Sequence, residues 1–235
     1  VPFNAPHAPM QAPDEYLARY ETLGKPKRET FAAMVTCMDD AVGEITTALD
    51  EVGQTDNTLI VFFSDNGGPR KLGADNGLLS EGKGTLYEGG VRVPAFCHWP
   101  NVVPAGAKVS ELMHATDLFP TLLAVAAVKP DESAAIDGVN QWGAIIDKQP
   151  SARHEVLLNT TPFHGAVRIG DWKLIHNGHV RSTEAKPAST QQVELFHLAE
   201  DPFEEHNLAD ANAEKLAELT KRLEEYAAAA VKPMN

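Results

Sequence analysis

Asp65 and Asn66 stand at the end of a short apolar segment and are followed directly by two glycines. A carboxylate beside an amide oxygen offers two hard oxygen ligands of the kind that Ca²⁺ or Mg²⁺ takes in proteins. In open α/β sheets, ligands bind outside the carboxyl ends of the strands, where this pair is expected. Asp, Asn and Gly are also common turn residues, and a cation needs more than two protein ligands. The segment alone therefore leaves a metal site and a simple turn both open.

Lys83 and His7 are two further side chains whose sequence neighbours favour a role in a site. Lys83 lies between two glycines, so the backbone can approach a ligand closely while the ammonium group faces an anionic oxygen. His7 has a proline on each side within two residues, which stiffens its backbone, and its ring can donate a proton near neutral pH. A solvated lysine and a histidine in a surface loop are the competing interpretations.

The other candidate residues have weaker support for a role in a site. His114, His154 and His164 are expected to be structural or exposed, and His164 is the best placed because it lies in a Pro-Phe-His-Gly turn. No serine or cysteine stands in a Gly-x-Ser-x-Gly pattern, and no glycine-rich phosphate loop ends in Lys-Ser or Lys-Thr. The residues thus indicate a cation site with an anion-facing lysine and a histidine, and they supply no nucleophile.

The elements that position these residues follow from the apolar pattern. Apolar residues spaced by three and four predict a long helix from Pro26 to Gly53. The continuous run Thr58–Phe63 predicts a strand buried on both faces of a largely parallel sheet, with the Asp-Asn pair at its C-terminal end. We also expect a strand in the segment that ends at Cys97 and a helix from Thr116 or Asp117 to Val128.

After about residue 150, short strands joined by turns replace the alternation of strand and helix. The pattern predicts strands at 154–159, 166–169, 172–176 and 193–198, a flexible loop at 181–192, and a helix at 211–230. The expected fold class is therefore α/β, with residues 1–150 forming a sheet covered by helices. Residues 151–235 are expected to form a small antiparallel β-sheet subdomain with a C-terminal helix.

The composition excludes several classes of protein. The chain has 235 residues, of which 43% are hydrophobic and 23% charged, so wholesale disorder is excluded. The sequence contains no run of 18 apolar residues and therefore predicts no transmembrane helix. A net charge of −13 argues against nucleic acid and anionic membrane surfaces as partners. Two cysteines, Cys37 and Cys97, are too few for a disulfide framework or a cysteine-rich zinc site.

Several segments together resemble the sulfatase family, and they occur in the family's order along nearly the whole chain. The spacing between Asp65-Asn66 and Lys83-x-x-x-x-Glu-Gly-Gly is most similar to the arylsulfatase B and N-acetylgalactosamine sulfatase branch. The resemblance implies an alkaline-phosphatase-like mixed sheet sandwiched by helices, of which residues 1–150 would form the C-terminal part. The matching segments are Ala5–Pro13, Phe63–Gly68, Gly82–Pro94, Ala115–Thr121, Val167–Leu174 and Glu194–Leu208.

The resemblance also implies roles for the candidate residues. Asp65 and Asn66 would be two ligands of an active-site Ca²⁺, with Mg²⁺ as the alternative cation. Lys83 would contact the sulfate group, and His7 would bind sulfate and protonate the leaving alcohol. The cation and Lys83 would neutralise charge on the sulfuryl oxygens, while His7 supplies the proton that the departing oxygen needs. The implied substrate is a sulfate monoester on an aryl group or a sugar, including sulfated glycans.

The chain departs from the family pattern at the nucleophile. Sulfatases carry a Cys-x-Pro-x-Arg or Ser-x-Pro-x-Arg segment whose first residue becomes formylglycine, and neither cysteine nor any serine here fits it. The paired aspartates that supply the remaining metal ligands are also missing. Because the chain opens at the family's mid-sequence His-x-Pro segment, we expect the C-terminal half of a sulfatase, inactive alone and prone to self-association. Family members are usually exported, so the expected location of the parent protein is periplasmic or extracellular.

Two other functions remain open from the sequence. Other hydrolases of the alkaline phosphatase superfamily, acting on phosphate or phosphonate esters, share much of the Asp-Asn and His pattern. The settings of His7 and Lys83 favour sulfate over these. A non-catalytic domain that binds carbohydrate or protein would need an exposed aromatic platform, and the charge of −13 argues against an anionic partner for it.

Overall fold

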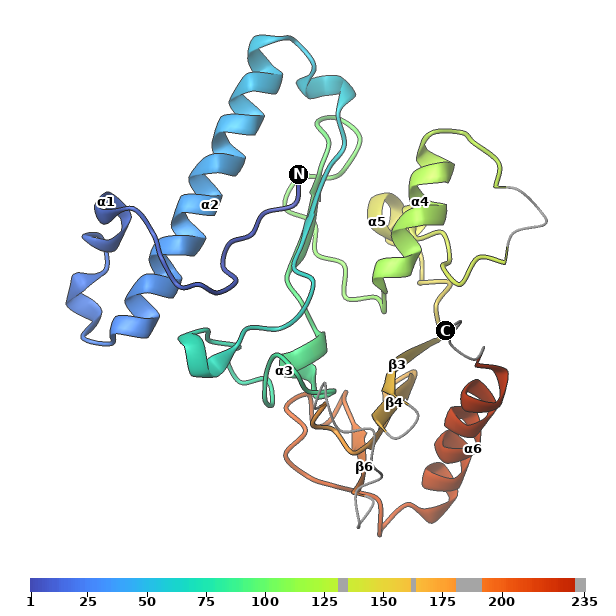
Figure 1. The fold of residues 1–235 in the computed structure, drawn as a ribbon. Helices are drawn as coiled ribbons and strands as arrows, with labels where there is room; N and C mark the ends of the chain where they lie inside the picture. Colours follow the sequence, from blue (N-terminus) through green and yellow to red (C-terminus); the bar gives the residue numbers. More distant parts are fainter. Residues whose placement is uncertain (131–134, 162–163, 181–191, 231–235) are drawn as a thin grey trace, which may run out of the picture. The chain divides into compact units, whose positions relative to one another are not determined.

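A computed structural model describes residues 1–130, 135–161, 164–180 and 192–230 (Figure 1). The chain divides into two compact units, residues 1–100 and residues 101–235, and each is described by itself. The boundary expected near residue 150 concerns the catalytic and C-terminal parts of the family and stays a prediction. Within the described ranges, no helix combines the length and the apolar character needed to cross a membrane.

The first unit is built along the helix α2 (Pro26–Glu51), which confirms the predicted long helix (Figure 1). Pro26 occupies its first turn, where the missing N–H costs nothing, and Gly53 follows its end with a left-handed φ of +65°. Ala33 and Met34 are its buried residues. The short helix α1 (Asp14–Leu17) packs against α2, and the 3-10 turns η1 (Glu21–Leu23) and η2 (Thr55–Asn57) lie next to its two ends.

Strand β1 (Ile60–Phe63) pairs antiparallel with β2 (Ala95–His98), which confirms both strands but not the burial expected of the first. The rings of Phe62 and Phe96 stack with their centroids 5.0 Å apart. On the opposite face, Val61 is 37% exposed and Phe63 is 44% exposed. The prediction of a strand buried on both faces of a largely parallel sheet is therefore wrong for this unit, because among its described residues β1 has a single neighbouring strand, which runs antiparallel to it.

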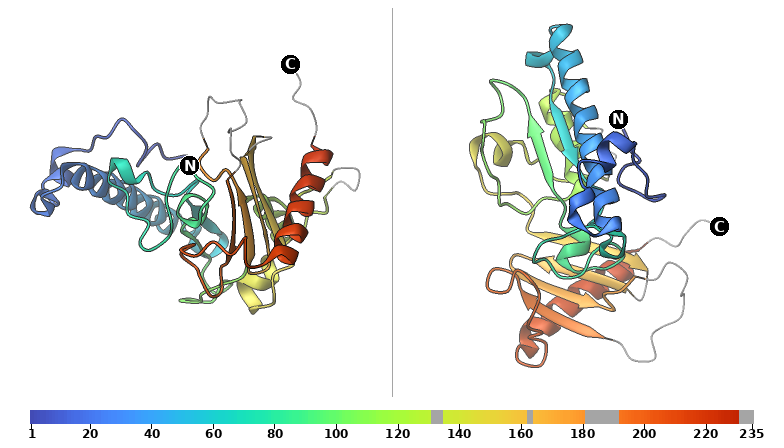
Figure 2. Two further views of the ribbon diagram at one scale, coloured as in Figure 1. Left: turned by 90° about the horizontal axis from the view of Figure 1, so that it is seen from below. Right: turned by 90° about the vertical axis from the view of Figure 1, so that its left-hand side faces the viewer.

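The second unit contains a four-stranded antiparallel sheet in the order β3-β4-β5-β6, with helix α6 (Ala213–Ala229) along it (Figures 1 and 2). Leu219 of α6 is fully buried with Val167, Leu174 and Leu195 of the sheet. The four predicted strands and the C-terminal helix are thus confirmed, while most of the loop predicted at 181–192 lies outside the described residues. The strands are β3 (Glu155–Thr161), β4 (His164–Ile169), β5 (Trp172–His176) and β6 (Val193–His197).

Buried and partly buried ion pairs fasten this sheet to the segments around it. The ammonium group of Lys173 lies 2.8 Å from Oε1 of Glu204, and both side chains are fully buried. Arg222 of α6 binds the Glu155 carboxylate of β3, with Nε 2.9 Å from Oε2, and this guanidinium lowers the pKa of Glu155. The sheet and α6 are therefore held together by charge as well as by the leucine core.

Helices α4 (Leu118–Val125) and α5 (Trp142–Asp147) precede the sheet. Helix α4 starts directly after Asp117, as predicted, but it ends three residues before Val128. The capping bonds belong to the 3-10 turn η4 (Ala115–Asp117), because the ring of His114 accepts from the N–H of Thr116 and Asp117 accepts from the N–H of His114. Asp117 is buried and also binds the Arg153 guanidinium, so it anchors the start of the sheet region to α4.

Candidate functional site

Asp65 and Asn66 occupy the turn that follows β1, at the C-terminal end of the strand as predicted. The hydroxyl of Ser64 donates to the carbonyl oxygen of Asn66 at 2.9 Å, and the Asn66 side-chain NH₂ donates to the carbonyl of Gly67 at 3.2 Å. Within the described residues, no donor binds the Asp65 carboxylate or the side-chain oxygen of Asn66. Both oxygens are therefore available as ligands for a hard cation such as Ca²⁺.

The glycines after this pair let the turn dock closely on the short helix α3 (Glu88–Val91). The N–H of Gly67 donates to the carbonyl of Gly90 at 2.8 Å. A Cβ atom on Gly67 would lie 1.8 Å from the carbonyl oxygen of Gly89, so any side chain at position 67 would collide with backbone. The Glu-Gly-Gly segment thus forms a short buried helix that seats the Asp65-Asn66 turn.

Asn76 fastens the same turn to the loop that carries Lys83. Its side-chain oxygen accepts from the N–H of Gly68 at 2.9 Å, and its NH₂ donates to the carbonyls of Gly68 and Glu81, each at 3.0 Å. The N–H of Lys83 also donates to the carbonyl of Gly68, at 3.3 Å, and its side chain is exposed. The structure therefore brings Asp65, Asn66 and Lys83 into one hydrogen-bonded assembly around Gly68.

Sequence reasoning missed Asn76. The only local signal is the Asn-Gly dipeptide, which indicates a turn residue and nothing more. That its amide matches both backbone groups of Gly68 depends on a contact between positions eight residues apart, which no periodicity encodes.

His7 is exposed in the N-terminal loop and is held by its neighbours. Its N–H donates to the carbonyl of Asn4 at 2.8 Å, and its ring Nδ1 donates to the carbonyl of Ala8 at 2.9 Å. The ring therefore has a fixed direction, and Nε2 is left to face solvent or a ligand. In the described part of the chain no hydrogen bond joins His7 to Asp65, Asn66 or Lys83, so its membership of the same site stays a prediction.

The three weaker histidine candidates do not extend this site. His114 belongs to the cap of η4, and burial lowers its pKa. His154 is exposed at the start of the sheet region. His164 begins β4, and its side chain lies outside the described residues.

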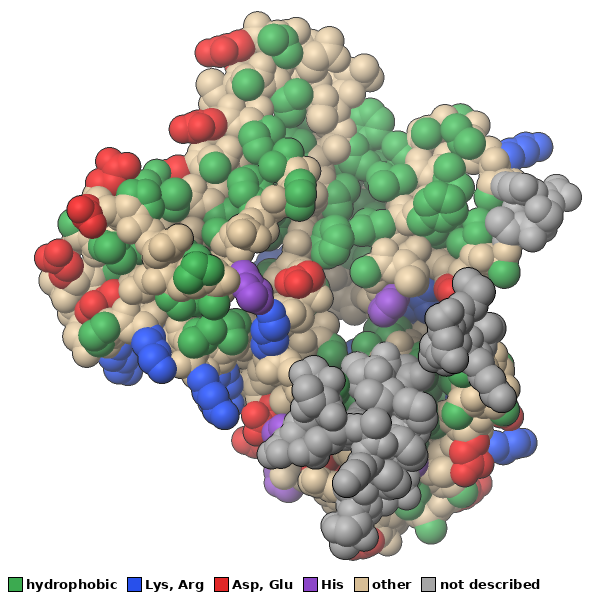
Figure 3. Space-filling view, in the orientation of Figure 1, with side chains coloured by type: hydrophobic (Ala, Val, Ile, Leu, Met, Phe, Trp, Pro, Cys, Tyr) green, Lys and Arg blue, Asp and Glu red, His purple; other side chains and the backbone are tan. Residues whose placement is uncertain are grey.

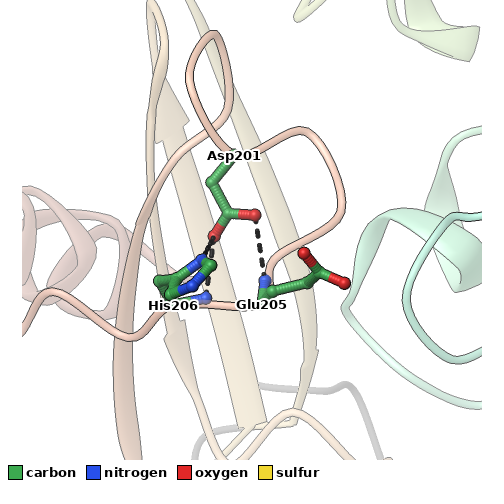
Figure 4. Close-up of side chains that lie close together, drawn as sticks. All are labelled: Asp201, Glu205 and His206. Atoms are coloured by element: carbon green, nitrogen blue, oxygen red, sulfur yellow. Dashed lines mark hydrogen bonds and ion pairs between the residues drawn. The ribbon is translucent and has the colours of Figure 1, made fainter.

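A separate group of possible ligands, Asp201, Glu205 and His206, lies after β6 (Figure 4). The Asp201 carboxylate accepts from the N–H of Glu205 at 3.0 Å and from that of His206 at 2.9 Å. Glu205 and His206 are exposed. Asp201 therefore already serves as the cap of a tight turn, and this geometry accounts for the grouping without a metal ion.

Two models of protein families match this chain. The family model described as Sulfatase matches residues 1–128, and the model described as N-sulphoglucosamine sulphohydrolase, C-terminal, matches residues 81–230. Arylsulfatase J of Mus musculus is 29% identical to this chain, and the match covers 98% of this chain and 45% of arylsulfatase J. Human N-acetylgalactosamine-6-sulfatase is 31% identical to this chain, and the match covers 90% of this chain and 44% of the human enzyme.

A solved structure shares the fold over nearly the whole chain. The crystal structure of Ps i-CgsB in complex with k-i-k-neocarrahexaose is 36% identical, with a TM-score of 0.83, and covers 95% of this chain and 48% of that chain. The chain thus spans about half the length of the relatives that it matches.

Proposed function

Because the chain belongs to the sulfatase family, we propose that it supplies half of the active site of an enzyme that hydrolyses sulfate monoesters. The observation that carries the proposal is the assembly around Gly68, in which a pair of free oxygen ligands is fastened to an exposed lysine. A cation ligand pair beside a fixed positive charge suits an ester whose oxygens bear negative charge.

Each of the four candidate residues of this chain has a defined role in the proposed site. Asp65 and Asn66 hold a Ca²⁺ ion, with Mg²⁺ as the alternative, through their free side-chain oxygens. When bound, the cation stabilises the negative charge on the sulfuryl oxygens. Lys83 contacts the sulfate group as a point charge, and His7 binds sulfate and donates a proton to the departing alcohol oxygen.

The remaining parts of the proposed site would lie in a segment that corresponds to the half of the relatives not matched by this chain. They are a formylglycine nucleophile, made from a cysteine or a serine, and the other metal ligands. Two protein oxygens fill only part of the six to eight positions that Ca²⁺ takes, so this half alone cannot complete the metal site. The boundary near residue 150 would then separate the catalytic part from a C-terminal subdomain.

The substrate that we propose is a sulfated sugar. This is supported by two relatives, one named as an N-acetylgalactosamine-6-sulfatase and one solved with a neocarrahexaose. Both names point to carbohydrate rather than to a simple phenol. We also propose a periplasmic or secreted location for the enzyme.

The test is a comparison of sulfate and phosphate esters of the same phenol, assayed with the full-length protein. We expect the sulfate ester to be hydrolysed with the higher kcat/KM. A preference for the phosphate or phosphonate ester would instead assign the protein to another branch of the superfamily. Absence of turnover with all the esters, together with tight glycan binding, would indicate a non-catalytic binding protein.

A further inference from the structure

Four exposed cations of the first unit form a basic cluster at the start of α2 and in the 3-10 turn η3 (Arg70–Leu72). Residues 1–100 contain eight Lys and Arg against fourteen Asp and Glu, so half of the unit's cations gather in one place on an acidic unit. Figure 3 shows cationic side chains gathered at the N-terminal end of α2, with acidic ones spaced along the rest of the helix. The members of the basic cluster are Lys25, Lys27, Arg70 and Lys71.

The two halves of the basic cluster are far apart in sequence and are fastened together by hydrogen bonds. The ammonium group of Lys27 donates to the carbonyl of Lys71 at 3.1 Å, and Arg28 donates to the carbonyl of Gly73 at 3.1 Å. A Cβ atom on Gly73 would lie 2.5 Å from the carbonyl oxygen of Lys27, so the backbones are in close contact. The cluster is therefore a fixed feature of the fold.

The charge of the basic cluster is not neutralised by neighbouring carboxylates. Within the described residues, none of its four members forms an ion pair. Glu29, which is close in sequence, accepts from the backbone N–H of Lys25 at 3.2 Å, and Asp75 accepts from the N–H of Gly77 at 2.9 Å. The four positive charges are thus exposed and unpaired within the described residues.

The basic cluster continues directly into the proposed sulfate site. Turn η3 follows Gly68 after one residue and leads to Asn76, the side chain that binds Gly68. The stem of Arg70 packs against the loop of Lys83, because a Cβ atom on Gly82 would lie 3.4 Å from Cγ of Arg70. Arg70 therefore lies beside the loop that carries Lys83, at the edge of the basic cluster.

We propose that the basic cluster binds a second sulfate group of a polysulfated glycan whose scissile sulfate is held at Lys83. This inference rests on the proposed function. A chain with a net charge of −13 repels polyanions at long range, so binding one requires a local concentration of positive charge. Such contacts lie away from the bond that breaks, so they lower KM and leave kcat largely unchanged. An aryl sulfate, with one anionic group, gains nothing from them.

The experiment compares the full-length protein with its Arg70→Gln/Lys71→Gln variant and with Lys108→Gln, an exposed cation of the second unit, as control. The probes are a polysulfated oligosaccharide and p-nitrophenyl sulfate. We expect the double variant to raise both Kd by calorimetric titration and KM for the oligosaccharide about five- to tenfold, since exposed ion pairs are each worth up to about a factor of five. The constants for p-nitrophenyl sulfate should change less than twofold, and the difference should shrink as salt is added.

An unchanged Kd for the oligosaccharide would overturn the inference, as would an equal loss in Lys108→Gln. Equal weakening of p-nitrophenyl sulfate would also overturn it, because the cluster would then act on the scissile sulfate. The two proposals can fail separately. If the wild-type protein hydrolyses no sulfate ester but the double variant binds the oligosaccharide more weakly than wild type, the proposed function is contradicted and the basic cluster is supported as a binding surface.

Discussion

The side-chain amide of Asn76 binds both backbone groups of Gly68, accepting from its N–H at 2.9 Å and donating to its carbonyl at 3.0 Å. This pairing holds the turn with the proposed metal ligands at a fixed place relative to the loop with the proposed sulfate contact. Because catalysis depends on the mutual placement of charges, a residue that touches neither ligand can still control the rate.

Asn76→Ala in the full-length enzyme should lower kcat/KM for a sulfate ester by about 10- to 100-fold, since a displacement of about 1 Å costs that much. The free energy of unfolding should fall by about 1 to 3 kcal/mol, because the N–H and carbonyl of Gly68 and the carbonyl of Glu81 each lose a hydrogen bond. Asn57→Ala, an exposed asparagine of the same unit, is the matched control.

Steady-state kinetics of the Asn76→Ala/Lys83→Ala double variant complete this test. If Asn76 acts by placing Lys83, its loss should matter much less once the lysine side chain is gone. Fully additive losses would show that Asn76 supports activity by another route.

His7→Gln should impair sugar and alkyl sulfates more than p-nitrophenyl sulfate. A nitrophenolate leaves without help, whereas a sugar alkoxide needs a proton from a general acid, which is typically worth about 10²- to 10⁴-fold. The ratio of kcat/KM between the two substrates measures this. His98→Gln, an exposed histidine on β2, serves as control, and an equal loss on both substrates would remove the acid role from His7.

The sequence pattern predicted the elements whose signal is local. Helices α2 and α6 each repeat an apolar period over their own length, and the strands of the second unit are short segments joined by turns. Each appears within a few residues of its expected bounds. The burial of β1 was not predicted correctly, because the exposure of Val61 and Phe63 depends on what covers the strand and not on the strand itself.

The candidate site was predictable only in part, for a similar reason. Asp65 and Asn66 stand at a strand end, and the glycines around Lys83 mark a loop, so both signals are readable. The bonds that join them run from Asn76 and the N–H of Lys83 to Gly68, and such contacts between loops leave no pattern. The basic cluster is likewise hidden, because it joins positions near 27 and near 71.

The 235-residue chain alone should bind Ca²⁺ weakly and hydrolyse no sulfate ester. Asp65 and Asn66 leave most of the coordination positions to water, and no cysteine or serine of this sequence stands in a Cys-x-Pro-x-Arg or Ser-x-Pro-x-Arg segment. Calorimetric titration and a chromogenic ester assay measure the two properties. Submicromolar Ca²⁺ affinity would mean that other residues of this chain complete the metal site.

The isolated chain should also self-associate through the exposed face of β1 and β2, increasingly so as salt screens its net charge of −13. Phe63→Lys should reduce this association, whereas Phe119→Lys, at an exposed phenylalanine of the second unit, should not. Light scattering across a salt series provides the measurement. A compact monomer at every salt concentration that binds no apolar dye would contradict the prediction.

Lys83 is the residue that we propose this chain contributes to the sulfate site, and removal of its side chain tests that role in a single measurement. Lys83 binds Gly68 through its backbone N–H, so Lys83→Ala leaves this bond in place and isolates the role of the ammonium group. The measurement is kcat/KM for a sulfate ester in the full-length enzyme, with Lys108→Ala as control. We predict a loss of about 100- to 1,000-fold for Lys83→Ala and less than twofold for the control. Wild-type kcat/KM in Lys83→Ala would contradict the proposed role of this residue.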